Sequence, residues 1–318
     1  MRVLITGVTG FVGSHLAEHL LTVTDWEVTG LSRTLDHVKN VEGLLPRLRL
    51  QVTDCGDREA VGRVVASVRP EAVFHLAGQA LESISWHDPV ATFMQNVTGE
   101  INLFEALLHT QPRPRTLIVG SGLAYGLVKP EENPISEAQP PRPASPYAVS
   151  KIAADYLGYQ YFVSYQLPVL RLRPFNQLGP RQQASFAIPA FARQIAAIER
   201  GEVEPVLRTG NLTAVRDFTD VRDAAVAYRL TLEHGAPGEA YNLGTGTGYA
   251  MRSLLERLVS LSSAAIRIEQ SPDLLRPVDV PRIVADASKL KAQTGWQPAI
   301  DIDQSLRDTL NYWRAADS

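Results

Sequence analysis

The chain opens with Arg2-Val3-Leu4-Ile5-Thr6-Gly7-Val8-Thr9-Gly10-Phe11-Val12-Gly13, an apolar run followed by three glycines spaced three residues apart. The run predicts a buried strand, and Ser14 to Leu21 repeats its apolar residues at helical spacing. Glycines between a strand and a helix suit a tight turn that a pyrophosphate can approach, with the helix N–H groups facing the anion. The spacing is G-x-x-G-x-x-G rather than G-x-G-x-x-G, and a merely flexible turn is the alternative. Its place between strand and helix favours nucleotide binding.

Strands and helices continue to alternate after this turn. Predicted strands cover Glu27 to Leu31, Leu48 to Val52, Ala72 to Ala77, Thr116 to Gly120 and Pro168 to Arg173, and predicted helices cover Arg58 to Val68, Pro89 to Leu108 and Pro189 to Arg200. Such alternation predicts an α/β fold of Rossmann type, a doubly wound parallel sheet with helices on both faces. Ligands in this fold lie beyond the carboxyl ends of the strands, where Gly7, Asp54, Gly78 and Ser121 fall.

Composition narrows the class of protein. The 318 residues are 45% hydrophobic and 20% charged, with a net charge of −3, so there is no basic excess that would indicate nucleic acid. Cys55 is the single cysteine and the histidines lack metal-ligand spacing, so we expect neither a disulfide nor a metal site. There is no signal-peptide pattern and no apolar run of membrane-spanning length, and we therefore expect a cytoplasmic protein without a membrane partner.

The end of the second strand bears on the choice of cofactor. Ser32-Arg33 stands there, where NAD-selective sites usually place a carboxylate for the ribose 2′-hydroxyl. An arginine suits a 2′-phosphate, which favours NADP(H) with NAD(H) as the alternative; a solvated loop role for Arg33 is equally consistent. Asp54 follows the third strand, where its carboxylate either accepts from an adenine amino group or forms an ordinary turn.

Ser145-Pro146-Tyr147-Ala148-Val149-Ser150-Lys151 predicts the start of a helix, with Ser145 as the cap and Pro146 in the first position. Tyr147 and Lys151 are four residues apart and share one face. An ammonium group beside a phenol lowers the phenol pKa, which would make Tyr147 a proton donor or acceptor near neutral pH. Such a pair also arises by accident on half-buried helices. Ser121 adds a hydroxyl that can bond a substrate carbonyl oxygen.

Four motifs carry a resemblance to a known family: Gly7-x-x-Gly10-x-x-Gly13, His75-Leu76-Ala77-Gly78, Ser121-x-x-x-Tyr125-Gly126 and Tyr147-x-x-x-Lys151. In this order they resemble extended short-chain dehydrogenases/reductases that modify nucleotide sugars, the NAD-dependent epimerase/dehydratase family. The resemblance implies that Ser121, Tyr147 and Lys151 are catalytic. It implies the following cofactor-binding residues: Gly7, Gly10, Phe11, Val12, Gly13, Ser32, Arg33, Asp54, Leu76, Ala77, Gly78, Tyr147, Lys151 and Pro174.

The second half resembles the GDP-sugar members of the family, the GDP-mannose 4,6-dehydratases and above all the GDP-6-deoxy-4-keto-mannose reductases. The resemblance is carried by Pro174-Phe175-Asn176-Gln177-Leu178-Gly179-Pro180, by Gly210 to Asp223 and by Leu275 to Val280. It implies these substrate-binding residues: Ser121, Asn176, Asn211, Arg216, Arg276 and Asp279. Two arginines can grip a pyrophosphate by forked hydrogen bonds. For Arg222 we expect instead a surface charge cluster with Asp217, Asp220 and Asp223.

The resemblance implies two domains. Residues 1–174 plus 212–247 would bind NAD(P), and residues 175–211 plus 248–318 would form a smaller C-terminal α/β domain that binds the nucleotide sugar. It also implies a homodimer paired through the helices Pro89 to Leu108 and Tyr147 to Tyr165.

One departure from the family pattern disfavours one of the family's reactions, the elimination of water. Dehydratases place acids just after the catalytic Ser or Thr, whereas this chain has Gly122-Leu123-Ala124. The expected activity is NADPH-dependent reduction of the 4-keto group of a GDP-linked 6-deoxyhexose, giving a GDP-rhamnose-like product. The alternatives are a UDP-sugar 4-epimerase, a GDP-mannose 4,6-dehydratase-like enzyme and a nucleotide-sensing scaffold without turnover.

Overall fold

The computed structural model describes residues 1–275, 278 and 280–316. Within them, seven parallel strands form one sheet in the order β10-β6-β5-β4-β1-β2-β3. The strands are β1 (Arg2–Thr6), β2 (Glu27–Ser32), β3 (Leu48–Val52), β4 (Ala72–His75), β5 (Arg115–Val119), β6 (Val169–Pro174) and β10 (Ala240–Leu243). The strand order reverses between β1 and β4, which is where a doubly wound sheet opens a crevice for ligands. The predicted Rossmann-type class is confirmed.

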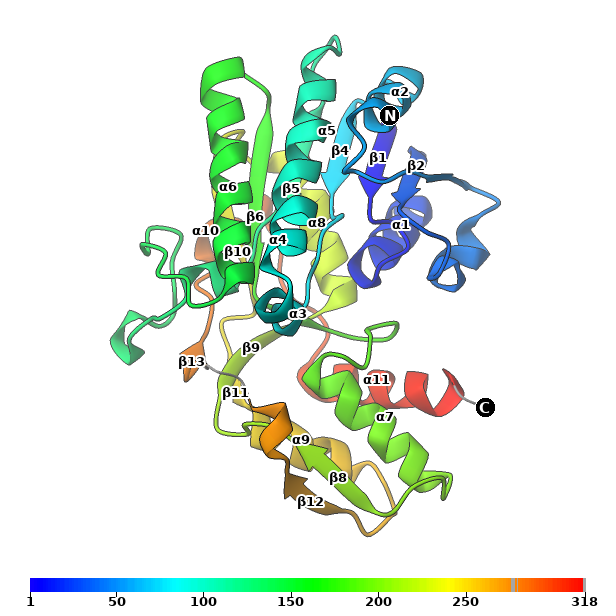
Figure 1. The fold of residues 1–318 in the computed structure, drawn as a ribbon, viewed down its shortest axis with the longest axis vertical. Helices are drawn as coiled ribbons and strands as arrows, with labels where there is room; N and C mark the ends of the chain where they lie inside the picture. The colour runs from blue at the N-terminus through cyan, green and yellow to red at the C-terminus, as the bar shows by residue number, and fades with distance from the viewer. Residues whose placement is uncertain (276–277, 279, 317–318) are drawn as a thin grey trace.

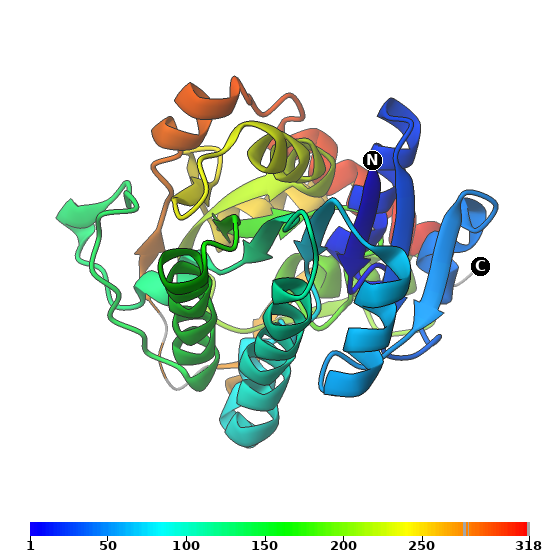
Figure 2. The same cartoon turned by 90° about the horizontal axis from the view of Figure 1, so that it is seen from above.

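Helices cover both faces of this sheet (Figure 1, Figure 2). The helices α1 (Phe11–Val23) and α8 (Val221–His234) pack on one face, with α10 (Ser288–Thr294) beside α8. The opposite face carries α2 (Arg58–Val68), α5 (Gly99–Leu108) and α6 (Pro146–Tyr165). Alternation along β1 explains the two cores, since Val3 and Ile5 enter the first and Leu4 enters the second.

A smaller α/β unit lies beyond one end of the sheet (Figure 1). Among the described residues, β7 (Asn176–Leu178), β9 (Val215–Asp220), β11 (Gly248–Ala250) and β13 (Arg282–Ile283) form a four-stranded sheet, and β8 (Val206–Thr209) pairs with β12 (Arg267–Gln270). The helices α7 (Ala187–Glu199), α9 (Met251–Ser260) and α11 (Ile302–Ala316) enclose a separate apolar core. The division of the chain into domains stays a prediction. The strand β9 lies in the range 212–247 that was predicted to bind NAD(P), and it pairs within the smaller sheet.

Short helices complete the described fold: η1 (Val38–Leu44), α3 (Glu82–His87), α4 (Pro89–Phe93), η2 (Met94–Thr98), η3 (Gly122–Tyr125), η4 (Pro130–Glu132) and η5 (Pro272–Leu274). Over the described ranges, no helix has the combined length and apolar character that a bilayer crossing requires.

The expected single helix from Pro89 to Leu108 is wrong in one respect. It consists of α4, a π-helical turn at η2 and then α5. A π-turn inserts an extra residue and shifts the faces of a helix, and such turns are frequent at functional sites. Asn96, inside the turn, is buried and bonds to groups outside its own helix. The apolar spacing that predicted one continuous helix gives no sign of these contacts, because they involve segments far away in the sequence.

The expected surface cluster around Arg222 is also corrected, because its acids are interior. Asp217 is fully buried and accepts hydrogen bonds from Thr245, Gly246 and Ala285. It therefore joins three loop segments of the smaller unit.

The other two acids of that cluster are buried as well. Asp223 accepts from the N–H groups of Ala299 and Ile300. Asp220 pairs with Arg222 at 2.8 Å, and Arg222 also reaches Asp308 at 2.8 Å. A carboxylate that accepts several hydrogen bonds can be buried in a fold. The run of charged residues does not reveal these partners, and it therefore predicted a surface cluster.

We expect Gly13→Ala to destabilise the fold by roughly 1–3 kcal/mol, as overpacking usually does. A Cβ built at Gly13 would lie 2.2 Å from the Gly7 carbonyl oxygen, with backbone on both sides of the contact. The matched control is Gly62→Ala within α2, where a Cβ would meet nothing within 4 Å. This control should stabilise the helix by about 0.5–1 kcal/mol. Urea and thermal unfolding measure both changes, and equal stability of the two variants would contradict the packing argument.

Candidate active site

The glycine turn after β1 brings backbone groups to the reversal point of the sheet. Gly7 has φ +72°, a left-handed conformation that favours glycine, and its N–H donates to Leu31 O at 2.8 Å. Gly10 is the N-cap residue of α1. Because glycine has no side chain, no side-chain cap binds the N–H groups of the first turn, which contains Phe11, Val12 and Gly13. The first N–H groups of a helix have no intrahelical partners, so the start of α1 is suited to an anion.

The segment after β4 forms the other wall of this crevice. Thr6 Oγ1 accepts from the N–H groups of Leu76 and Ala77 at 3.2 and 3.0 Å, and bonds to His75 Nδ1 at 2.8 Å. A Cβ on Gly7 would come within 2.9 Å of Ala77 N. The two loops are therefore in direct contact where a dinucleotide would cross the sheet.

The three predicted catalytic residues are brought together at the ends of β5 and α6. Ser145 Oγ caps α6 by accepting from Ala148 N at 3.2 Å, as predicted, which places Tyr147 in the first turn. The Tyr147 phenol forms a hydrogen bond with the Ser121 hydroxyl. Lys151 Nζ donates to Val119 O at 2.9 Å, two residues before Ser121.

The electrostatics of the phenol differ from the expectation. Burial raises the pKa of Tyr147 to about 12, the nearby Glu82 also raises it, and the Ser121 hydrogen bond opposes them. The expectation that Lys151 lowers this pKa is therefore wrong for the chain on its own, where desolvation has the largest effect. A phenol in this state keeps its proton at neutral pH.

Asn96 is a site residue that sequence reasoning missed. Its Oδ1 accepts from Gln79 N at 2.7 Å and its Nδ2 donates to Ser150 Oγ at 2.9 Å. Ser150 Oγ in turn donates to Tyr147 O at 2.7 Å. Asn96 thus ties the turn after β4 to the helix that carries Tyr147. Its place as a polar residue within the predicted helix from Pro89 to Leu108 was the available signal.

Tyr228 of α8 is a second buried phenol near this set. It accepts a hydrogen bond from Gln177 Nε2 at 3.3 Å, and burial raises its pKa, with Tyr147 adding to the increase. Gln177 O accepts from Gln182 Nε2 at 2.9 Å. In the sequence, Gln177 stands only within the segment Pro174 to Pro180 that carries the resemblance.

Apart from Ser121, the predicted substrate residues that the structure describes lie in the smaller unit, on or near β7 and β9. Asn176 Nδ2 donates to Asp217 O at 3.2 Å, and the buried Arg216 donates to Val215 O at 2.9 Å. Asn211 Oδ1 accepts from the backbone N–H and the hydroxyl of Thr213. Arg276 and Asp279 lie outside the described residues. β7 and β9 pair directly, and Asn176 lies opposite Phe218, two residues along β9 from Arg216.

The remaining predicted cofactor residues have these surroundings. Ser32 Oγ bonds to Thr9 Oγ1 at 2.7 Å, and Arg33 beyond it is exposed. Asp54 Oδ1 accepts from Gly56 N at 2.8 Å, which is the turn-forming alternative; an adenine contact stays a prediction. Pro174 ends β6 beside β10. A Cβ at Gly78 would lie 3.8 Å from Lys151 Nζ.

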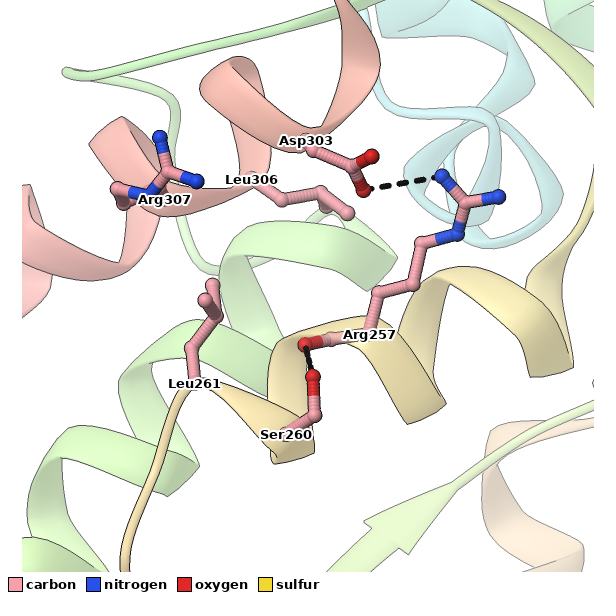
Figure 3. Close-up of a pocket in the computed structure, with 6 residues that line it drawn as sticks. All are labelled: Arg257, Ser260, Leu261, Asp303, Leu306 and Arg307. Atoms are coloured by element: carbon pink, nitrogen blue, oxygen red, sulfur yellow. Dashed lines mark hydrogen bonds and ion pairs between the residues drawn. The ribbon is translucent and has the colours of Figure 1, made fainter.

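A pocket of about 260 Å³ lies elsewhere, between α9 and α11 (Figure 3). Arg257 points toward Asp303 across it and is paired with that carboxylate at 2.9 Å, whereas Arg307 lies on the far side of Leu306. None of the predicted site residues lines this hollow. The candidate site is therefore defined by the convergence of Ser121, Tyr147 and Lys151 and by the crevice beside them.

Comparisons with known proteins agree with this geometry. Residues 4–309 match the family described as GDP-mannose 4,6 dehydratase. The chain is 35% identical over 317 residues to a GDP-6-deoxy-D-mannose reductase from Pseudomonas aeruginosa, covering 99% of this chain and 97% of that one. A solved structure of RMD from P. aeruginosa complexed with NADPH superposes with TM-score 0.87 at 34% identity, covering 99% of this chain and 100% of the other.

A UDP-glucose 4-epimerase from Thermus thermophilus in complex with NAD superposes with TM-score 0.88 at 33% identity, covering 99% of this chain and 100% of that one. Fold, site geometry and similarity over nearly the whole length lead to one assignment. The chain belongs to the extended short-chain dehydrogenases/reductases, the NAD(P)-dependent family that reduces, epimerises or dehydrates nucleotide sugars.

Proposed function

We propose that this protein reduces the 4-keto group of a GDP-linked 6-deoxyhexose with NADPH. The observation that carries the proposal is the convergence of Ser121, Tyr147 and Lys151. The Tyr147 phenol is hydrogen-bonded to the Ser121 hydroxyl, and the Lys151 amine is bonded to the carbonyl of Val119. Support also comes from the similarity to a GDP-6-deoxy-D-mannose reductase and to a structure complexed with NADPH.

The chain's residues fit a dinucleotide in the crevice. A side chain at Gly7 would strike Ala77, so only a bare backbone leaves room there. The N–H groups at the start of α1 would bind the pyrophosphate. Lys151 would hold the nicotinamide ribose, and Arg33 would meet the 2′-phosphate of NADP(H). When bound, the cofactor supplies the hydride; the protein supplies placement and electrostatics.

Proton delivery falls to Tyr147. Its phenol would donate to the C4 oxygen of the sugar as the carbonyl is reduced, and Ser121 would orient that oxygen by its hydroxyl. The Lys151 ammonium would offset the negative charge left on the phenolate. For the nucleotide diphosphate we propose Asn176, Asn211 and Arg216, with Arg276 and Asp279 completing the set.

Packing after Ser121 disfavours dehydration. A Cβ at Gly122 would lie 2.8 Å from the Phe175 ring, so an acid at this position has no room. The next residue, Leu123, packs in an apolar cluster with Tyr125 and Phe175. Neither residue can remove or return a proton, whereas elimination of water requires both steps.

An epimerase is the second candidate, because the T. thermophilus epimerase superposes as closely as the reductase structure does. Epimerases oxidise and then reduce the same sugar and need no added reductant. A nucleotide sensor without turnover is the third candidate, and the retained Ser121, Tyr147 and Lys151 speak against it.

We also propose a homodimer. Exposed apolar residues gather on α4, η2 and α6, which are neighbours in the fold. The apolar helix face consists of Val90 (72% exposed), Met94 (55%), Val149 (41%), Tyr156 (52%) and Val163 (58%). Clustered exposed apolar residues mark association surfaces in soluble proteins.

The proposed activity is tested by mixing the purified protein with NADPH and GDP-4-keto-6-deoxymannose and following the loss of NADPH absorbance. Tyr147→Phe should lower turnover by about 10²–10⁴-fold, because the proton donor is lost, while NADPH binding stays close to wild type. Tyr159→Phe, on an exposed part of α6, is the control and should keep full activity. Wild-type turnover in Tyr147→Phe, or conversion of a UDP-hexose without added reductant, would reject the proposal.

Arg33→Ala should weaken NADPH binding about ten-fold and leave NADH binding unchanged, since one charge-assisted contact to the 2′-phosphate is removed. Fluorescence titration with each cofactor measures both affinities. Arg63→Ala on α2, whose side chain is 70% exposed and pairs with Glu59, serves as control. An unaltered ratio of the two affinities would remove the argument for NADP(H).

Charge on the apolar helix face should separate the proposed dimer. The double variant Val90→Glu, Val163→Glu should have half the mass of wild type by light scattering, because two carboxylates per copy would be buried on pairing. Val203→Glu, 52% exposed and outside that face, should leave the mass unchanged. A monomeric wild type or a dimeric double variant would count against this interface.

A further inference from the structure

Arg173, near the end of β6, is a largely buried cation that the proposed reaction does not use. Its Nε and Nη2 donate to the two carboxylate oxygens of Asp155 at 2.9 and 2.6 Å. Asp155 is buried on α6, the helix that also carries Tyr147 and Lys151. A forked pair of this kind fixes the direction of the guanidinium plane as well as its position. Arg173 is therefore held rigidly against the helix of the catalytic phenol.

Charge neutralisation alone does not account for Arg173. Arg171, two residues earlier on β6, already donates to Asp155 Oδ2 at 2.9 Å, and its Nη2 donates to Gly238 O at 2.9 Å. One arginine would therefore be enough to balance the aspartate. A further buried cation costs desolvation energy, so the second arginine calls for another reason.

The far side of the guanidinium of Arg173 supplies that reason. Its Nη1 donates to Tyr125 OH at 2.9 Å, and its central carbon lies 5.4 Å from the centre of the Tyr125 ring, within the range of a cation–π contact. Tyr125 OH in turn donates to Asn242 Oδ1 at 2.7 Å. Both Tyr125 and Asn242 are buried. The phenol of Tyr125 is thus held from two sides, and Arg173 joins it to α6.

Tyr125 belongs to the same short helix as the proposed catalytic serine. Ser121 is the N-cap of η3, where its Oγ accepts from Leu123 N at 3.1 Å, and Tyr125 is the last residue of that helix. The stem of Arg173 also reaches the other side of Ser121. A Cβ built at Gly120 would lie 3.3 Å from Arg173 Cγ and 3.5 Å from Asp155 Oδ1. Arg173 therefore contacts the chain both before and after Ser121.

We propose that Arg173 is a positioning residue of the candidate active site, which sets the Ser121 hydroxyl against the Tyr147 phenol by joining η3 to α6. The proposal rests on the proposed function, in which Ser121 and Tyr147 act on the same oxygen. Arginine suits this role because its planar fork engages Asp155 while a further N–H points at Tyr125. A lysine would supply the charge without that geometry.

The main test compares Arg173→Lys with Arg171→Lys. The two side chains are equally exposed, at 12%, and both pair with Asp155, but Arg171 is directed to Gly238 rather than to η3. Arg173→Lys should lower kcat about ten-fold, because small displacements of reacting groups are costly. Its KM for the sugar nucleotide and its affinity for NADPH should stay close to wild type. Arg171→Lys should keep the wild-type kcat.

A variant cycle separates positioning from general stability. If Arg173 acts through Ser121, its loss should matter little once the serine hydroxyl is gone. In a Ser121→Ala background, Arg173→Lys should therefore lower kcat by at most about two-fold, because the two changes remove the same interaction. A full ten-fold loss in both backgrounds would show independent effects and would refute the proposed role.

Tyr125→Phe tests the same link with a smaller change, and it decides the question should Arg173→Lys fail to fold. It removes only the hydroxyl that Arg173 reaches, and kcat should fall several-fold with KM unchanged. Tyr161→Phe is the matched control, because Tyr161 is a buried phenol of α6 that donates to Glu105 Oε1 at 2.7 Å. Thermal unfolding of both variants shows whether stability is comparable. Equal kcat in the two variants would contradict the proposal.

This proposal and the proposed function fail in different ways. If wild type reduces the ketone while Arg173→Lys and Tyr125→Phe match their controls in kcat, the role of Arg173 is refuted and the proposed reaction stands. If neither wild type nor Arg171→Lys reduces the ketone, the proposed function is refuted and the role of Arg173 in it falls as well. A rise in KM with unchanged kcat in Arg173→Lys would also refute the positioning of Ser121.

Discussion

The backbone contact between Gly13 and the Gly7 carbonyl is the constraint on which the rest of the site depends. It leaves no space for a Cβ, so α1 lies against the end of β1 with its N-terminus at the crevice. A second close approach, of Gly7 to Ala77, brings the segment after β4 against the same turn. Gly78 follows at once and lies beside the Lys151 amine. The contacts of Gly13 and Gly7 exclude a side chain for steric reasons, and at Gly78 a Cβ would lie 2.7 Å from Asn96 Oδ1.

The interface between α5 and α6 changes character along its length, and the change follows function. Away from the strand ends, Phe104 stacks on Tyr161 with ring centroids 4.7 Å apart, as in any apolar helix pair. Toward the crevice, η2 carries the buried Asn96 and α6 carries Lys151. Polar groups in such a place are costly unless they are paired, and both side chains are hydrogen-bonded, Asn96 to Ser150 and Lys151 to Val119 O.

The sequence pattern predicted correctly those helices and strands in which apolar residues recur at one regular spacing. The bounds of α2 and β3 agree with the expectation, as do the cap Ser145 and the first-position proline of α6. The failures involve partners that lie far away in the sequence. In the interior, Asn96 forms hydrogen bonds with Gln79 and Ser150, and Asp217 forms them with Thr245 and Ala285. The prediction of the phenol pKa failed for a related reason. The spacing of Tyr147 and Lys151 shows a neighbouring charge but not the depth of burial, which raises the pKa.

The same scaffold hosts reduction, epimerisation and dehydration, so the direction of chemistry must come from side chains added to a common set. Here Gly122 is held against Phe175 and Leu123 is packed in an apolar cluster, so the positions after Ser121 are committed to packing. Neither side chain can carry a proton, so the positions next to Ser121 lack the acid and base that elimination of water requires. This packing, and not the protonation of Tyr147, is what argues against dehydration.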